Sequence, residues 1–491
     1  MKINTIKPNH KHSKIIIVAH LFMMIILIIF RLLYEPFDSR PESLIPLFSW
    51  VVCIQIIWSF WSWYTLAESL FNPYLLFLLS AFLFNAGQAF IEIFHLNKDG
   101  LLGGFDFIRF SSPTLLNSLF LVILSLGAWH LGALISFAQS PANEQKISPK
   151  SQAFYISSKS SYRVGIFLLS ISLFPAIYTI SNNLSLVMAS GYSGLYQVEH
   201  ATSVGAIPNI LTAFLIPSAF FILVGSKYQK KAKFISIAIV LIYSIIQFIL
   251  GQRNQGVMPL ISFSWLWHHV IYPIPKTLLL AVGSVIMFII IPLIAVIRNI
   301  GSQDRLSINF LIETFANIDN PIVAAISEMG SSMLTVAATL DLVPDVRNFQ
   351  MGTDYLYALL TLVPNYFGAI HPTVARGIPE QWLVEEINPY FAMHGGSYGF
   401  SFIAEAYLNF GWIGTPIALG IMGFLFAKFT LWISKSGEPA KMAMLASFLS
   451  FFLFFPRAES ALLIRPLLWY SFLPYWIVSW LSKKTYKRLA R

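Results

Sequence analysis

Residues 15–30 of the chain read IIIVAHLFMMIILIIF, a run without an acidic residue, a lysine or an arginine. A helix needs about 20 predominantly apolar residues to cross the hydrocarbon core of a bilayer, and the residues up to position 34 extend the run to that length. Four lysines precede the run, as in a signal peptide, but no small-residue cleavage site follows it. The segment is therefore predicted to be a retained first transmembrane span.

Apolar runs of this kind recur along the chain and dominate its composition. The chain is 56% hydrophobic and 11% charged, with a mean hydropathy of +0.69, whereas soluble domains carry about 25% charged residues. The sequence predicts an all-α integral membrane protein with about twelve transmembrane helices. They are expected at 15–34, 44–66, 73–95, 114–138, 163–181, 206–225, 233–250, 256–272, 277–297, 412–433, 440–456 and 461–481.

The longest interval between predicted spans, residues 298–411, contains two further apolar stretches. Residues 322–344 are interrupted by Glu328 and Asp341, and residues 355–370 are too short to span comfortably. We expect amphipathic or re-entrant helices on the outer face here, although the count becomes fourteen if both stretches cross. The expected organisation is a membrane domain of nine spans at 1–297, a large periplasmic loop at 298–411 and a membrane domain of three spans at 412–491.

Positive charge is distributed unequally between the two sides of the predicted bundle. With an even number of spans both termini lie on one side, and the segments on that side hold 21 of the 32 lysines and arginines but only three of the 22 acids. Cytoplasmic loops carry an excess of lysine and arginine. Both termini are therefore predicted to be cytoplasmic and residues 298–411 periplasmic.

Lysine and arginine also differ from each other in placement. Of 19 lysines, only Lys98 falls on the predicted outer side, whereas ten of 13 arginines do. Arginine binds phosphate and carboxylate with two parallel hydrogen bonds and keeps its charge. The outer arginines therefore predict an anion site, unless they only pair with the outer acids. They are Arg31, Arg40, Arg109, Arg253, Arg298, Arg305, Arg347, Arg376, Arg457 and Arg465.

Four of these arginines lie at the outer ends of predicted spans. Arg253 is in the turn GQRNQ at 251–255, Arg298 ends the ninth span, and Arg457 is in the turn FPRAE at 455–459. Arg465 begins the last span. An anion at the membrane surface, such as a lipid-linked pyrophosphate, would suit this arrangement. The alternatives are interfacial anchoring and salt bridges within the protein.

A second constellation is HGGSYGFSFIAEAYLNFG at 394–411. Its glycines permit close approach of the backbone to a ligand, so Gly395, Gly396 and Tyr398 are predicted to contact a glycan. Residues 401–409 are expected to form a short helix closed by Gly411. His394 and Glu405 are the candidate catalytic bases. Each also has a structural alternative, as a loop histidine and as the partner of an outer arginine.

Several motifs are absent from the sequence. No Asp-x-Asp pair is predicted on the outer face, and there is no Walker loop and no zinc pattern. We therefore expect no metal site and no cofactor. No nucleic-acid partner is expected either.

The arrangement resembles the O-antigen polysaccharide polymerases of the Wzy type. The resemblance rests on GQR at 251–253, Arg298 before the large loop, HGGSYG at 394–399 leading into EAYLNFG at 405–411, and PRAE at 456–459. It implies a GT-C-type, metal-independent inverting glycosyltransferase of the bacterial inner membrane that joins undecaprenyl-pyrophosphate-linked repeat units. The arginines would bind the pyrophosphate, and the implied partners are the lipid-linked glycan, the bilayer and a chain-length regulator.

Two other functions compete with this interpretation. An O-antigen ligase would share the fold and the donor but transfer the glycan to lipid A-core. A flippase or another secondary transporter would show internal repeats and charges at mid-membrane. Here no repeat is evident and the charges gather toward one face, which favours the polymerase over a transporter.

Overall fold

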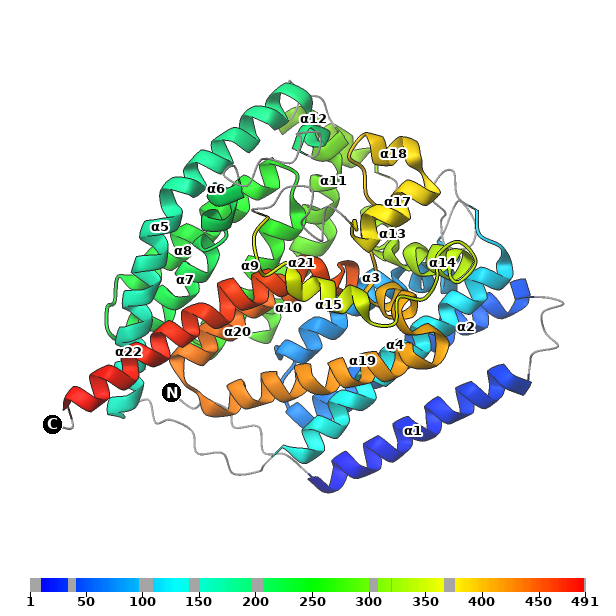
Figure 1. The fold of residues 1–491 in the computed structure, drawn as a ribbon, viewed down its shortest axis with the longest axis horizontal. Helices are drawn as coiled ribbons and strands as arrows, with labels where there is room; N and C mark the ends of the chain where they lie inside the picture. The colour runs from blue at the N-terminus through cyan, green and yellow to red at the C-terminus, as the bar shows by residue number, and fades with distance from the viewer. Residues whose placement is uncertain are drawn as a thin grey trace.

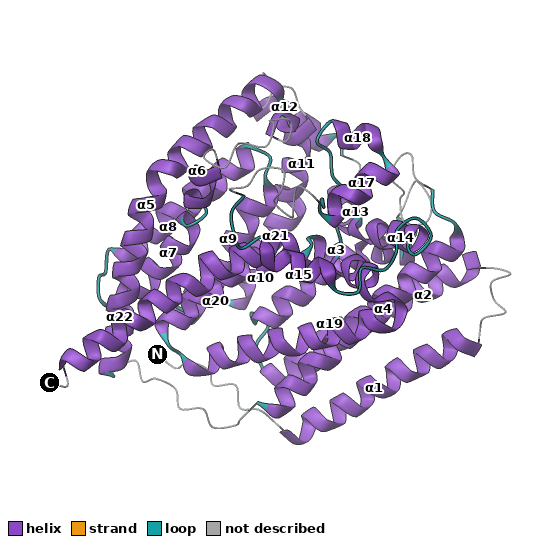
Figure 2. Cartoon of the chain, in the orientation of Figure 1, coloured by secondary structure: helices purple, strands orange, loops and turns teal. Residues whose placement is uncertain are grey.

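The computed structural model describes residues 10–33, 41–96, 109–140, 151–195, 206–299, 308–318, 320–365 and 376–489. Every regular element in these ranges is a helix, as Figure 2 shows. Twelve helical segments in the described part are long and apolar enough to cross a membrane. The predicted all-α class and the approximate number of spans are therefore confirmed. Arg40 and Arg305 lie outside the described residues.

Eleven of the twelve segments coincide with predicted spans. The helices that form them are α1 (His10–Leu33), α2 (Pro41–Ala67), α3 (Pro73–Ile93), α4 (Ser112–Gln139), α5 (Gln152–Ser190), α6 (Ala206–Thr212) with α7 (Leu215–Val224), α8 (Ala232–Ile249), α10 (Lys276–Val285) with η4 (Ile286–Ile290) and α11 (Ile291–Asn299), α19 (Phe402–Ser436), α20 (Pro439–Phe452), and α21 (Ser460–Pro466) with η7 (Leu467–Phe472) and α22 (Leu473–Leu489). Figure 1 shows them as a bundle in which α1 lies along one edge.

The predicted span at 256–272 forms α9 (Arg253–Val270), which is not among the twelve. Its first turn is polar and two histidines end it, so its mean hydropathy is low. Its path is nevertheless that of a span. Arg253, at its start, pairs with Glu328, which follows Ser327, the residue that accepts a hydrogen bond from Gln88 near the end of α3. The ring of His268, near its end, lies 5.5 Å from that of Phe71, just before α3 begins. The two ends of α9 therefore lie toward opposite ends of the bundle.

The twelfth apolar segment is Pro321–Leu342, which comprises α13 (Pro321–Gly330) and α14 (Ser332–Leu342). Both parts contact one end of the bundle, where α3 ends and α4 begins. A Cβ on Gly87 of α3 would lie 3.0 Å from the carbonyl oxygen of Ile326, and Thr114 of α4 donates to Asp341 over 2.6 Å. The pair therefore contacts this end of the bundle, called the site end below, and its expected position on the outer face stays a prediction.

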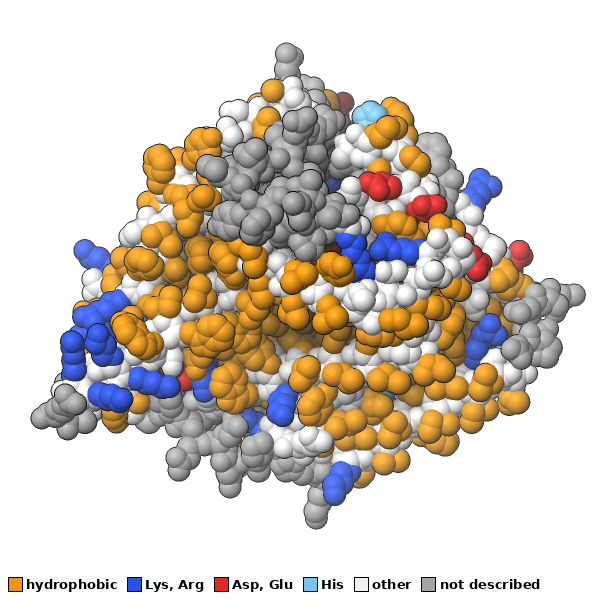
Figure 3. Space-filling model, viewed as in Figure 1, with side chains coloured by type: hydrophobic (Ala, Val, Ile, Leu, Met, Phe, Trp, Pro, Cys, Tyr) orange, Lys and Arg blue, Asp and Glu red, His pale blue; other side chains and the backbone are white. Residues whose placement is uncertain are grey.

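The remaining helices of the 298–411 segment are α12 (Ile308–Ala316), α15 (Thr353–Leu360), α17 (Pro379–Ile387) and α18 (Pro389–Met393). On α15, Asp354 is buried while Leu356, Leu359 and Leu360 are exposed, which is the pattern of an amphipathic helix at a bilayer surface. In Figure 1, α13, α14, α17 and α18 lie together at the upper right. Figure 3 shows most acidic side chains of this face in the same region, with hydrophobic side chains covering much of the rest.

Helices α4 and α19 pack side by side, and the first residues of both contact α14 at the site end. A Cβ on Gly132 would lie 1.9 Å from the carbonyl oxygen of Gly420, so the two backbones approach as membrane helices with small residues do. The predicted break in α19 is confirmed, because Gly411 has φ 63° and ψ −163°. The short helix before Gly411 therefore takes a direction of its own, with Ser401 as its N-cap.

Candidate functional site

Polar residues near the end of α3 hold the site end together. Asn85 donates to the carbonyl oxygen of Pro456 over 3.0 Å and accepts from the hydroxyl of Ser401 over 2.5 Å. Gln88 donates to the carbonyl oxygen of Ser327 over 2.7 Å. Three segments far apart in the sequence are thus fixed to one helix. These bonds position both of the charged clusters described next.

The first cluster, called the arginine cradle below, consists of Arg253, Arg298, Arg457 and Glu328. Arg253 binds one carboxylate oxygen of Glu328 over 2.6 Å, and Arg298 binds the other over 3.3 Å. Arg457 donates to the backbone carbonyl oxygen of Glu328 over 3.3 Å and to the hydroxyl of Ser331 over 3.2 Å. Three of the four predicted phosphate-binding arginines therefore meet at one glutamate.

Burial and packing make the cradle rigid. The side chain of Arg253 is 7% exposed and that of Arg298 29% exposed. The guanidinium of Arg298 lies 4.2 Å from the ring centre of Tyr192, a favourable cation–π arrangement. The rigid geometry suits binding of an anion, because little side-chain freedom remains to be lost.

The predicted glycine-rich stretch reaches the cradle through Gly399. This residue has φ 75°, and a Cβ on it would lie 3.1 Å from the side chain and the carbonyl oxygen of Arg457. The amide of Phe400 donates to the same carbonyl over 3.3 Å. Only glycine combines this dihedral angle with this close approach at no steric cost.

The other predicted residues of this stretch make contacts within α17 and α18. Gly395, with φ 71°, follows the end of α18, and Gly396 packs against the ring of Phe391. The hydroxyl of Tyr398 accepts a hydrogen bond from Asn388 over 3.0 Å. Their predicted contact with a glycan stays a prediction.

His394 lies on the surface just after α18. Its Nδ1 is 2.7 Å from the carbonyl oxygen of Tyr390, and a carbonyl only accepts, so Nδ1 carries the proton. Nε2 is then the nitrogen that can take up a proton. The ring also contacts that of Tyr390 in a tilted arrangement, with 4.4 Å between centres.

Glu405 lies on the first turn of α19 and is 1% exposed. Its two oxygens accept from the amide of Ser460 over 3.1 and 2.9 Å, and one also accepts from the Ser460 hydroxyl over 2.5 Å. Ser460 follows Arg457 by three residues. The turn 457–460 therefore connects the arginine cradle with the carboxylate of Glu405.

Arg465 has a different environment from the other three arginines. Its Nε donates to the carbonyl oxygen of Thr361 over 2.5 Å, and its guanidinium donates to that of Val363 over 3.4 Å. These carbonyls follow the C-terminus of α15, where a cation is favourable. Arg465 thus fixes the end of α15, and its predicted role in pyrophosphate binding stays a prediction.

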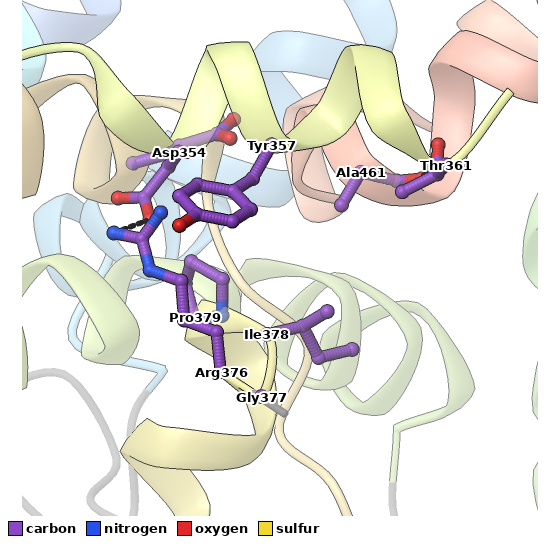
Figure 4. Close-up of a pocket in the computed structure, with 9 residues that line it drawn as sticks. Asp354, Tyr357, Thr361, Arg376, Gly377, Ile378, Pro379 and Ala461 are labelled. Atoms are coloured by element: carbon purple, nitrogen blue, oxygen red, sulfur yellow. Dashed lines mark hydrogen bonds and ion pairs between the residues drawn. The ribbon is translucent and has the colours of Figure 1, made fainter. Parts of the chain in front are cut away.

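The second cluster, called the carboxylate pocket below, lies between α15 and residues 376–379 (Figure 4). Asp354 pairs with Arg376 over 2.9 Å and accepts from the amide group of Asn409 over 3.0 Å. The guanidinium of Arg376 lies 4.3 Å from the ring centre of Tyr357. The pocket is small, with room for about one water molecule, and is lined by Asp354, Tyr357, Thr361, Arg376, Glu405 and Ala461 among others.

Acids gather around this pocket. Burial raises the pKa of Asp354, although Arg376 and Arg347 partly offset the effect. Burial also raises the pKa of Glu459, and its acidic neighbours Glu405 and Glu380 raise it further, to well above the ordinary carboxyl value. The pKa of Glu380 is likewise raised by burial. Carboxyl groups in such surroundings retain protons at higher pH than exposed ones.

Sequence reasoning did not single out Glu328 and Asp354 as site residues, and it named Arg376 only among the ten outer arginines. Glu328 was recognised only as an interruption of an apolar stretch, and an ionisable residue in such a stretch is itself a signal of function. Asp354 and Arg376 belong to no motif with a fixed spacing. Among the described residues, no group of three His, Cys, Asp or Glu side chains is arranged to hold a metal ion.

Comparison with known proteins gives one match. Residues 15–489, nearly the whole chain, match the family model described as O-antigen polysaccharide polymerase Wzy. No curated protein and no solved structure matches the chain. The chain belongs to the O-antigen polysaccharide polymerase Wzy family.

Proposed function

We propose that the chain binds the donor glycan by its undecaprenyl pyrophosphate in the arginine cradle, at the periplasmic face of the inner membrane. Membership of the family makes the chain a polymerase of O-antigen repeat units and a multi-pass protein of the bacterial inner membrane. The same membership favours polymerisation over the ligase and transporter functions considered from the sequence. The proposal concerns how and where the reaction takes place.

The observation that carries the proposal is the convergence of three guanidinium groups from separate segments of the chain. Arg253 and Arg298 bind the carboxylate of Glu328, and Arg457 binds its backbone carbonyl oxygen. Guanidinium groups remain protonated at physiological pH, so positive charge and hydrogen-bond donors are concentrated at this place. A pyrophosphate supplies the negative charge and the acceptor oxygens that such a site binds best.

The cradle also suits the chemistry of glycosyl transfer from a lipid pyrophosphate. When the bond from the anomeric carbon to the phosphate breaks, negative charge develops on the leaving pyrophosphate. Preorganised guanidinium groups stabilise that charge without reorganising. This mechanism uses the chain's own side chains and corresponds to a GT-C-type, metal-independent inverting transferase.

A base must remove the proton from the attacking hydroxyl of the acceptor, and we propose His394 or Glu405 for this role. Glu405 lines the carboxylate pocket, and its carboxylate accepts three hydrogen bonds from Ser460, which fix its position. His394 has Nε2 available as a proton acceptor, and the loop that follows it reaches Arg457 at Gly399. Glu405 is linked to the cradle because Ser460, its hydrogen-bond donor, follows Arg457 in the same turn. His394 is linked to the cradle because Gly399, five residues later, approaches Arg457 closely.

The decisive experiment replaces Arg457 or Arg253 by lysine, which keeps the charge and loses the bidentate geometry. We expect the ladder of surface glycan to disappear on a gel, with a single repeat unit retained and normal protein levels in the membrane. Arg109→Lys, at an exposed outer position between α3 and α4, serves as the control and should keep the ladder. Full activity of the cradle variants would refute phosphate recognition, and loss of all repeat units would indicate a ligase or a flippase.

The proposed orientation places both termini in the cytoplasm and the segment 298–411 in the periplasm. It rests on the 21 positive residues and three acids of the predicted inner segments. An alkaline phosphatase fusion at residue 350 should be active, and one at residue 230 inactive. The reverse pattern would put the cradle on the wrong side of the membrane for a periplasmic reaction.

A further inference from the structure

An apolar groove lies between α4 and α19, two of the helices that are long and apolar enough to cross the membrane. The helices run side by side in Figure 1. The groove measures about 480 Å³, within the range of about 300–1,000 Å³ that holds small molecules. All its lining residues are apolar or glycine, among them Leu131, Ile135, Ile417, Ile421 and Phe424. Such a wall suits a hydrocarbon chain and offers no partner to a polar ligand.

The groove ends at a lysine. Ile417, Ile421 and Phe424 line the groove, and Lys428 follows at the same spacing of three to four residues. Residues at this spacing share one face of a helix. The Nζ of Lys428 lies 5.6 Å from the ring centre of Phe424. Lys428 lies on the side of the groove away from Gly411, so the positive charge is at the end opposite the site end.

The surroundings of Lys428 indicate a place just inside the membrane interface. Trp432, one turn further along α19, is 40% exposed, and tryptophan is enriched at the boundary between bilayer and water. Within the part of the chain that the structure describes, no acid forms an ion pair with Lys428. Ionisable groups at membrane depth normally pair with an opposite charge. An anionic ligand would supply that charge.

A second cation lies further along the same seam between α4 and α19. Lys435 follows Lys428 by seven residues and therefore lies on the same face of α19. Its Nζ donates to the hydroxyl of Ser140, just after the end of α4, over 2.6 Å. The seam thus changes from apolar to positively charged toward the end opposite the site end. This order of surfaces matches the order of acyl chain and phosphate in a phospholipid.

We propose that the groove binds an anionic glycerophospholipid of the leaflet opposite the site end, with one acyl chain between α4 and α19 and the phosphate at Lys428. The position of the lysine fixes the direction of the lipid. A lipid with its head at the arginine cradle would enter the groove from the other end. The site is therefore separate from the proposed donor site and does not depend on it. In the proposed orientation, the leaflet is the cytoplasmic one.

The test titrates the purified full-length protein in detergent with phosphatidylglycerol and counts bound lipid by native mass spectrometry. We expect the wild type to bind one molecule more tightly than the rest. Lys428→Met should weaken its binding about fivefold, which corresponds to the loss of one cation at an anionic headgroup. Lys428→Arg keeps the charge and should bind nearly as tightly as the wild type. Lys483→Met, at an exposed lysine of α22, is the control and should bind like the wild type.

A second pair of variants tests the groove itself. Ile421 is 57% exposed at its rim, so Ile421→Trp should narrow the groove without entering the contact between the two helices. It should weaken phosphatidylglycerol binding about tenfold, the effect of displacing about two methylene groups. Ile245→Trp makes the same change on α8, where Ile245 is 55% exposed, and should have no effect.

Three results would overturn the proposal. Equal binding by the wild type, Lys428→Met and Ile421→Trp would mean that the lipid associates without a site. Binding of undecaprenyl phosphate but not of phosphatidylglycerol, with the same dependence on Lys428, would assign the groove to an isoprenoid. Dimers of the wild type that Ile421→Trp dissociates, without bound lipid, would assign it to a second copy of the chain. Arg457→Lys should bind phosphatidylglycerol like the wild type, so failure of the donor site would leave this result unchanged.

Discussion

The arginine cradle and the carboxylate pocket are neighbours in which different side chains predominate. In the cradle three arginines meet one glutamate, whereas around the pocket Asp354, Glu380, Glu405 and Glu459 face two arginines. The turn 457–460 belongs to both clusters. The difference indicates that the cradle is suited to an anion, whereas the buried carboxyl groups around the pocket tend to retain their protons.

The largest effect is expected on the polymerisation rate, and it decides which of the two proposed bases, Glu405 or His394, removes the proton. A true base should lose about 100- to 10,000-fold in polymerisation rate when replaced. We expect this loss for either Glu405→Gln or His394→Ala, with normal protein levels, when each variant is assayed for ladder formation. A packing residue would lose protein together with activity. If both variants remain active, the base lies elsewhere.

A smaller effect should rank the arginines within the cradle. Arg253 is more buried than Arg298 and closer to Glu328, so its interactions are less screened by water. Arg253→Gln should therefore reduce the polymerisation rate about 100-fold and Arg298→Gln about tenfold. Rates measured with the purified variants at equal substrate concentration check the order. The reverse order would mean that burial does not decide the contribution of each arginine.

Glu328 provides the next test, because its carboxylate lies between the arginines where we propose that the pyrophosphate binds. Glu328→Gln removes the competing carboxylate and should strengthen binding of inorganic pyrophosphate about tenfold, measured in moderate salt. Asp341→Asn on α14, which removes an acid of the same helical pair, is the control and should leave binding unchanged. Weaker pyrophosphate binding in Glu328→Gln would show that the glutamate organises the arginines rather than competing with the ligand.

The smallest effect concerns stability and distinguishes the acids of the pocket region. Because the pKa of Glu459 in the folded protein lies well above its ordinary value, folding favours the protonated form. The corresponding stabilisation is complete at pH values below the ordinary carboxyl pKa and is lost as the pH rises through the folded-state pKa. Glu459→Gln should therefore raise the melting temperature by about 2 °C at pH 8.5 and leave it unchanged at pH 5. An equal change at both pH values would show that ionisation of Glu459 does not contribute.

Predictions from sequence succeeded where the signal is local. Apolar runs define membrane helices because the bilayer leaves no other partner for the backbone, and eleven predicted spans coincide with apolar helices of the described part. The break at Gly411 was also predictable, since its φ of 63° is one that few other residues adopt. The arginines in turns and at the ends of predicted spans were recognised by their residue type and position, and three of them meet in the structure.

The sequence by itself determined which segments are apolar enough to enter the membrane and which arginines lie at their ends, because hydropathy and charge act residue by residue. Only the tertiary structure decided that Glu328 lies among those arginines and that Asp354 and Arg376 form a pocket with Glu405. These residues come from segments up to 129 positions apart, as for Arg457 and Glu328. Such contacts depend on how the helices pack. The hydrogen bonds from Asn85 and Gln88 that fix this packing join distant segments, and they leave no periodic pattern or motif in the sequence.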